Sequence, residues 1–164
     1  MILHGIFQKC TVNLFLFVNS NNMLYLLVLI VTLIILSITI KPNKCLQDVK
    51  EKYHIFLDYV RNNNVPDKFK VLRKEILVSG FTNYSDSLGY NVNKGDEIAV
   101  CVDGTPNQAF HVLIHELAHS TVKEYSHSPE FWKNFEELKT MCQNIGIYQP
   151  VNKKTEFCGK FISD

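Results

Sequence analysis

The sequence lacks both a marked excess of charge and a recognisable cysteine pattern. Its 164 residues contain 17 Lys and Arg against 16 Asp and Glu, a formal net charge of +1 at pH 7. A dedicated nucleic-acid-binding protein usually carries a strong basic excess, so the composition argues against that class. The five cysteines form no C-x-x-C pair and are odd in number, which fits neither a disulfide framework nor a zinc ribbon. The cysteine pattern therefore predicts no disulfide framework and favours a reducing compartment.

Charged residues are almost missing from the first forty positions, where Lys9 is the only one. Residues 23–40 run for eighteen positions without a charge, proline or glycine, which approaches the length needed to cross a bilayer. The pattern predicts an N-terminal extension over 1–22, a transmembrane anchor over 23–40 and one globular domain over 43–164. A cleaved signal peptide and a buried core helix are the alternatives, and translation from Met1 or from Met23 is left open.

The charges around the predicted anchor indicate its orientation. Four lysines lie between positions 41 and 52, whereas only Lys9 precedes the anchor. The positive-inside rule then places the C-terminal side in the cytosol. We expect a single-pass membrane protein that contacts the membrane through residues 23–40 and has a cytosolic globular domain.

The first half of the globular domain gives one clear helix and one hairpin. Apolar residues recur at helical spacing over 46–60, before three asparagines end the pattern. Residues 65–86 contain short apolar runs without a period, so no element is assigned there. Two short apolar runs, 90–92 and 98–102, flank an Asn-Lys-Gly-Asp turn and predict an antiparallel hairpin.

Two further helices follow, and each begins with a capping signal. Thr105 precedes a proline and stands three residues before Gln108, the pattern of a capping box, so a helix is expected from there to about Glu124. Ser128 followed by proline predicts the start of a last helix, which ends before Gly146. The predicted fold class is α+β, with a small antiparallel sheet packed on the first of these two helices.

That helix contains the pattern H-E-x-x-H as His115, Glu116 and His119. Histidines four residues apart project from one helix face and suit two ligands of one zinc ion. Glu116 lies about 100° around the helix from His115, where its carboxylate can act as a general base on a zinc-activated water.

A catalytic zinc site usually has three protein ligands, so one more is needed. His127 is the preferred third ligand because it follows the predicted helix end and lies just before the next cap. His111, one turn before His115, is interpreted as a histidine at the surface or behind the metal ligands, not as a ligand itself. The competing ligands are the glutamates at positions 124, 130, 136 and 137.

The stretch HELAHSTVKEYSHSPEFW, residues 115–132, resembles the WLM/SprT-like zinc metallopeptidases, including the small members encoded by large DNA viruses. In that family a third histidine follows H-E-x-x-H in an H-x-P-E-F or H-x-x-F-W context, here residues 127–132. The resemblance implies a zincin-like fold, zinc bound by His115, His119 and His127, and a catalytic Glu116. It covers less than half of the chain.

The expected function is zinc-dependent hydrolysis of peptide bonds in protein substrates. Family members that act on DNA-associated proteins usually carry added DNA-binding elements, and this chain shows neither a zinc ribbon nor a basic tail. The strand over 97–102 is a hypothetical edge for an extended peptide. Tyr125 and Tyr148 are weighed as oxyanion helpers, with packing the preferred role for each.

Two alternatives stay open. The first is a membrane-anchored binding or structural protein in which zinc only holds the helices together, with Cys101 or Cys142 completing the site. The second is a secreted peptidase whose signal peptide is removed. Substrate identity, DNA dependence and oligomeric state are not indicated by the sequence.

Overall fold

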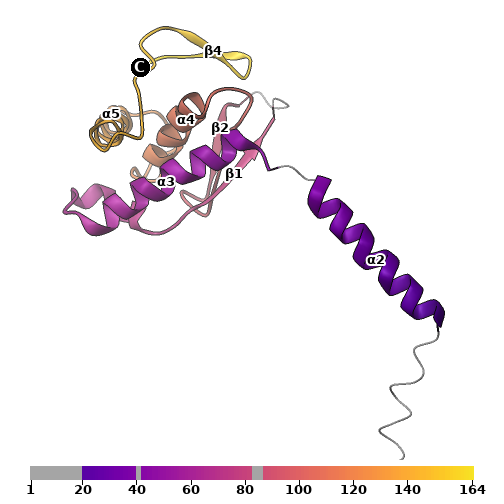
Figure 1. The fold of residues 1–164 in the computed structure, drawn as a ribbon. Helices are drawn as coiled ribbons and strands as arrows, with labels where there is room; N and C mark the ends of the chain where they lie inside the picture. Colours follow the sequence, from indigo (N-terminus) through magenta and orange to yellow (C-terminus); the bar gives the residue numbers. More distant parts are fainter. Residues whose placement is uncertain (1–19, 40–41, 83–86) are drawn as a thin grey trace, which may run out of the picture. The chain divides into compact units, whose positions relative to one another are not determined.

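A computed structural model of the protein describes residues 20–39, 42–82 and 87–164. The chain divides into two compact units, 1–41 and 42–164, which are described separately (Figure 1). Most of the predicted N-terminal extension over 1–22 lies outside the described residues.

The first unit contains helix α2 (Ser20–Thr39), which covers most of the predicted anchor. The part of α2 between Asn22 and Ser37, which is apolar except for Thr32, measures about 21 Å at 1.5 Å per residue, whereas a bilayer core needs about 30 Å. Within the described ranges, no helix is both long enough and apolar enough to cross a membrane. The predicted transmembrane anchor over 23–40 is therefore wrong, and the single-pass membrane localisation that depended on it is not supported.

Helix α3 (Lys44–Asn62) opens the second unit and confirms the first predicted helix. The Asn43 side chain accepts a hydrogen bond from the Leu46 amide at 3.0 Å and so caps the first turn. One face of α3 is buried in the core, as the helical spacing predicts; its buried residues are Val49, Tyr53, Phe56, Leu57 and Val60.

The main sheet has three strands in the order β1-β3-β2, with β1 at Leu77–Phe81, β2 at Gly89–Val92 and β3 at Glu97–Cys101. Strands β2 and β3 form the predicted antiparallel hairpin. Strand β1 pairs with β3 in parallel, so the expectation of an antiparallel sheet is wrong for this strand. A parallel pairing depends on a partner about twenty residues away and has no local signal. The 3-10 helix η1 (Asp67–Arg73) precedes β1.

The middle position of β3 corrects the predicted peptide-binding edge. Both sides of β3 are paired, with β1 on one side and β2 on the other, so residues 97–102 present no free edge. Strand β2 is the edge strand, and within the described residues no strand pairs with its outer side.

Helix α4 (Pro106–His119) lies at the centre of the unit and contacts α3, α5, β2 and β3 (Figure 1). The predicted capping box is confirmed, because the side chains of Thr105 and Gln108 each bond the other residue's backbone. The helix ends at His119, about five residues earlier than predicted. The Thr121 hydroxyl bonds the Ala118 carbonyl and competes with the helical pattern there.

Helix α5 (Pro129–Asn144) begins at the predicted cap, where the Ser128 hydroxyl accepts from the Phe131 amide at 3.1 Å. After α5 the chain forms a second, two-stranded sheet from β4 (Thr155–Phe157) and β5 (Lys160–Ile162), which the sequence did not predict.

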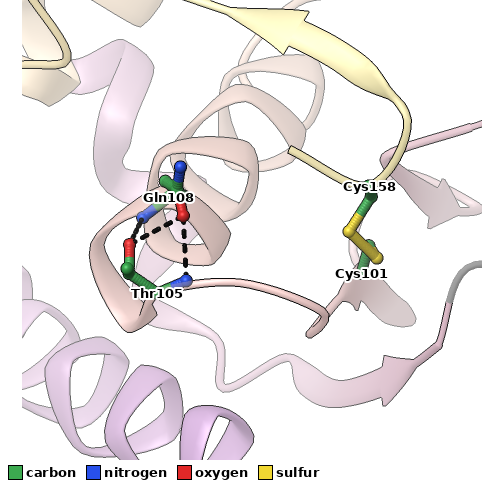
Figure 2. The surroundings of a disulfide bond; sticks show 4 residues. All are labelled: Cys101, Thr105, Gln108 and Cys158. Carbon is green, nitrogen blue, oxygen red and sulfur yellow. Dashed lines mark hydrogen bonds between the residues drawn. A yellow bond between two sulfur atoms is a disulfide. The ribbon is translucent and has the colours of Figure 1, made fainter. Parts of the chain in front are cut away.

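A disulfide links Cys101, at the end of β3, to Cys158 in the turn between β4 and β5 (Figure 2). The expectation that no disulfide forms is therefore wrong; Cys45 and Cys142 are free thiols. The two bonded cysteines are 57 positions apart, so their spacing gave no motif. The bond attaches the C-terminal hairpin beside the N-terminal cap of α4.

Candidate metal centre

Three imidazoles meet on one side of α4. His115 and His119 lie one turn apart on the helix, and the chain turns back after α4 to bring His127 beside them. The Nε2 atoms of His115 and His127 are 3.0 Å apart, and one ligand nitrogen of each histidine lies within 4.8 Å of the others. Two nitrogens bound to one tetrahedral zinc ion would be about 3.4 Å apart. These three residues can therefore hold a metal ion, as predicted.

Burial keeps the two helix histidines in the form that binds metals. Desolvation lowers the pKa of His115 to about 3, and the neighbouring His119, His127 and His111 contribute in the same direction. Desolvation also lowers the pKa of His119 to about 4, with smaller contributions from His127 and Lys94. Both imidazoles are therefore neutral at pH 7, so a metal ion does not have to displace protons from them.

The ring of Phe131, in the first turn of α5, is fully buried beneath the three histidines. Its centroid lies 4.9 Å from that of His115, 4.4 Å from His119 and 4.6 Å from His127. A fixed aromatic surface restricts the orientations of the imidazoles and keeps water away from one side of the cluster. The cap at Ser128 thus positions Phe131 as well as starting the helix.

Lys94 holds the loop that carries His127. Its Nζ donates to the carbonyls of Val122, Lys123 and Glu124 at 2.6, 2.5 and 2.8 Å. The same ammonium lies 4.4 Å from the ring centroid of Tyr125. Three carbonyls that have left the helical pattern are thereby satisfied by one cation from the β2–β3 turn.

Glu116 lies beside the cluster and is 7 % exposed. Desolvation raises its pKa to about 7, so the carboxyl can take up and release a proton at neutral pH. Strand β2 packs closely on it: a Cβ placed on Gly89 would lie 3.1 Å from the Glu116 Cγ and 2.7 Å from the Val112 Cγ1. Glycine is required here because the strand backbone approaches the helix so closely.

His111 is not part of the cluster of three, and it is buried rather than at the surface. Its Nδ1 lies 2.7 Å from the Tyr148 hydroxyl, which donates to the Asp164 carboxylate at 2.7 Å. Desolvation lowers the pKa of His111, although the nearby Asp164 carboxylate opposes this effect. Tyr148 is buried, in agreement with the packing role preferred from the sequence, and it also makes these hydrogen bonds. Tyr125 is exposed, so the packing role expected for it is wrong.

The competing ligands lie elsewhere. Glu124 accepts from the Ser128 hydroxyl, Glu136 pairs with Lys139 and Glu137 pairs with Lys68. Glu130 is exposed. Neither candidate fourth ligand belongs to the cluster either: Cys101 is in the disulfide, and Cys142 is buried, where desolvation raises its thiol pKa above the ordinary value.

Comparisons with known proteins do not add to this description. No family model, curated protein or solved structure matches the chain. The resemblance seen over residues 115–132 stays a prediction, and the proposed function depends on the geometry of the site. Sequence reasoning missed the roles of Lys94 and of the His111–Tyr148–Asp164 chain, because neither forms a motif.

Proposed function

We propose that the protein is a zinc-dependent endopeptidase that hydrolyses peptide bonds of protein substrates. The observation that carries the proposal is the convergence of three imidazoles with a buried carboxyl, Glu116, at their side. A site that only holds helices together has no use for such a carboxyl. The resemblance of residues 115–132 to WLM/SprT-like metallopeptidases points in the same direction.

His115, His119 and His127 would hold the zinc ion. When bound, zinc supplies Lewis-acid polarisation of a carbonyl group and makes water more acidic. Glu116 would accept a proton from the attacking water and then pass it to the leaving amine. Its pKa, raised to about 7 by burial, suits both steps because the group exchanges protons readily near neutral pH.

The outer edge of β2 provides a place for an extended peptide. The Cys101 amide donates to the Leu88 carbonyl, which sets the alternation along the strand: the backbone of Leu88 and Tyr90 faces β3, and that of Gly89 and Asn91 faces outward. The Gly89 carbonyl accepts from the Ser87 hydroxyl, so its amide is the group left for a peptide. Gly89 is also the residue that packs on Glu116. A peptide added to this edge would run beside the proposed general base.

The test is cleavage of an unfolded protein by the full chain loaded with Zn²⁺, followed by gel electrophoresis. We expect Glu116→Gln to lower the rate by about 10²–10⁴-fold, the usual contribution of a general base, while bound zinc measured by mass spectrometry stays at one ion per chain. Glu130→Gln is the matched control, because Glu130 is exposed on α5 and lies outside the cluster.

Equal activity of Glu116→Gln and the wild type would remove Glu116 from the mechanism. A folded, zinc-loaded wild type that cleaves nothing would favour the alternative of a zinc-stabilised binding protein. The same assay with single-stranded DNA present asks whether DNA-associated proteins are the substrates, a class that the net charge of +1 does not favour.

A further inference from the structure

A cavity of about 390 Å³ opens beside the metal centre. It lies between α4, α5 and the C-terminal hairpin, and the start of β2 closes another side. His115 and Glu116 belong to its wall, so the cavity is continuous with the proposed catalytic site. A substrate side chain next to the bond being cut would enter it.

The wall of this cavity suits a flat apolar group. Phe135 is buried, whereas Trp132 and Phe161 are 47 % and 61 % exposed, which leaves aromatic surface uncovered next to the metal centre. Aromatic rings pair favourably with such surfaces in stacked or edge-to-face arrangements. Val112 adds an aliphatic contact from α4.

His111 supplies a polar ring to this wall, and its hydrogen bonds determine which ring nitrogen carries the proton. The Asp164 carboxylate can only accept, so the Tyr148 hydroxyl donates to it and must accept from the His111 Nδ1–H. The neutral His111 ring then carries its lone pair on Nε2. His111 is 6 % exposed and lines the cavity.

Because His111 lines the cavity and its Nδ1 is used by Tyr148, we infer that Nε2 is the ring nitrogen accessible from the cavity. It bonds no described residue, and the only described side-chain atom that is both sealed from solvent and without a partner is Asn91 Oδ1. The cavity therefore combines aromatic surface with polar groups, and among these groups His111 Nε2 is an acceptor whose tautomer is set by the hydrogen bond from Nδ1 to Tyr148.

We propose that this cavity is a specificity pocket for a tyrosine side chain of the substrate, with the phenol hydroxyl donating to His111 Nε2 and the ring packing against Trp132 and Phe161. The inference rests on the proposed peptidase function. Phenylalanine would fill the same space but leave the acceptor unpaired, and a site built around a hydrogen bond disfavours a ligand that lacks it.

The test compares tyrosine hydroxamate with phenylalanine hydroxamate, because a hydroxamate group chelates zinc and presents the side chain without needing turnover. Binding to the full chain loaded with Zn²⁺ is measured by calorimetry at pH 7.5. We expect tyrosine hydroxamate to bind about tenfold more tightly, the effect of one added hydrogen bond.

His111→Phe should reduce this ratio to about one, because the ring is retained and the acceptor is lost. His54→Phe is the matched control: His54 is exposed on α3, and the ratio should not change. If His111→Phe does not fold, Tyr148→Phe takes its place. It removes the acceptor that fixes the tautomer and should lower the ratio.

Equal binding of the two hydroxamates to the wild type would overturn the pocket, as would an unchanged ratio in the folded His111→Phe variant. The sites cut in an unfolded protein, mapped by mass spectrometry, should carry tyrosine at one position next to the scissile bond. Tyrosine preference in binding without any cleavage would refute the proposed function and leave the pocket standing. Cleavage without a tyrosine preference, either in hydroxamate binding or at the cut sites, would refute the pocket and leave the proposed function standing.

Discussion

At the scale of single residues, the third metal ligand depends on a side chain far from it in sequence. His127 lies in a segment with no regular structure, between the end of α4 and the cap of α5. The Lys94 ammonium, from the β2–β3 turn, donates hydrogen bonds to three carbonyls of that segment. A buried or half-buried cation that bonds three carbonyls is difficult to replace, since each carbonyl left unpaired is costly.

A substitution that removes this ammonium should therefore lower the affinity of the site for zinc, although it changes none of the three histidines. We expect Lys94→Met to weaken Zn²⁺ binding by about 10–100-fold, the size of effect seen when groups that orient metal ligands are lost. Competition with a chromophoric chelator measures the affinity. Lys154→Met is the matched control, because Lys154 also lies over an aromatic ring, that of Phe161, but far from the His127 loop in sequence. Equal zinc affinity of Lys94→Met and the wild type would contradict the role.

At the scale of elements, the local signals predicted what depends on local chemistry. The capping box at Thr105 and the cap at Ser128 begin α4 and α5 where expected, because a cap involves residues only three positions apart. The pattern H-E-x-x-H likewise places two histidines on one helix face by helical geometry alone.

The structural features that the sequence did not predict depend on contacts between distant segments. The parallel pairing of β1 with β3 and the bond between Cys101 and Cys158 have no local signature. Helix α4 can end early because the carbonyls after His119 find hydrogen-bond donors elsewhere. The Lys94 ammonium, from the β2–β3 turn, is that donor. The apolar run over 23–40 predicts a helix correctly but not one long and apolar enough to cross a membrane.

The C-terminal hairpin is the element whose position is most directly testable. Strands β4 and β5 are three residues each, too short to be stable alone, and the disulfide joins their turn to β3. The ring of Phe157 packs closely on Gly104, because a Cβ placed on Gly104 would lie 2.6 Å from that ring. We expect the double variant Cys101→Ser, Cys158→Ser to lower the free energy of unfolding by about 2–4 kcal/mol, because the bond closes a long loop in the unfolded chain.

Chemical denaturation under non-reducing conditions measures this change. Cys45→Ser is the control, because Cys45 is a half-buried free thiol. The wild type treated with a reductant should behave like the double variant. Identical midpoints for the wild type with and without reductant would show that the bond does not stabilise the fold.

At the scale of the whole molecule, Asp164 joins three parts of the second unit. The Asp164 carboxylate accepts from Lys139 of α5 at 2.6 Å, from Tyr148 and from the Val151 amide, and Tyr148 links it to His111 of α4. The Lys139 side chain is buried, so its charge needs this partner and Glu136. These contacts of Asp164 thereby hold the neighbouring residues 160–163, which belong to the wall of the cavity beside the metal centre.

This arrangement predicts how stability depends on pH. Burial alone would raise the pKa of Asp164, but hydrogen bonds from Lys139, Tyr148 and the Val151 amide outweigh it and lower the pKa below the ordinary value. Because the folded protein then binds this proton less readily than the unfolded chain, the contribution of Asp164 is fully present above the ordinary pKa of about 3.9. It is lost as the pH falls through the lower pKa of the folded state.

We therefore expect Asp164→Asn to be less stable than the wild type by about 1–3 kcal/mol at pH 6, the value of a hydrogen bond to a charged group, and the difference to shrink below pH 4. Urea denaturation from pH 3 to pH 7 measures both proteins. A difference that stays constant over this range would mean that Asp164 has an ordinary pKa in the folded protein, and that its ion pair with Lys139 adds no stability that depends on ionisation.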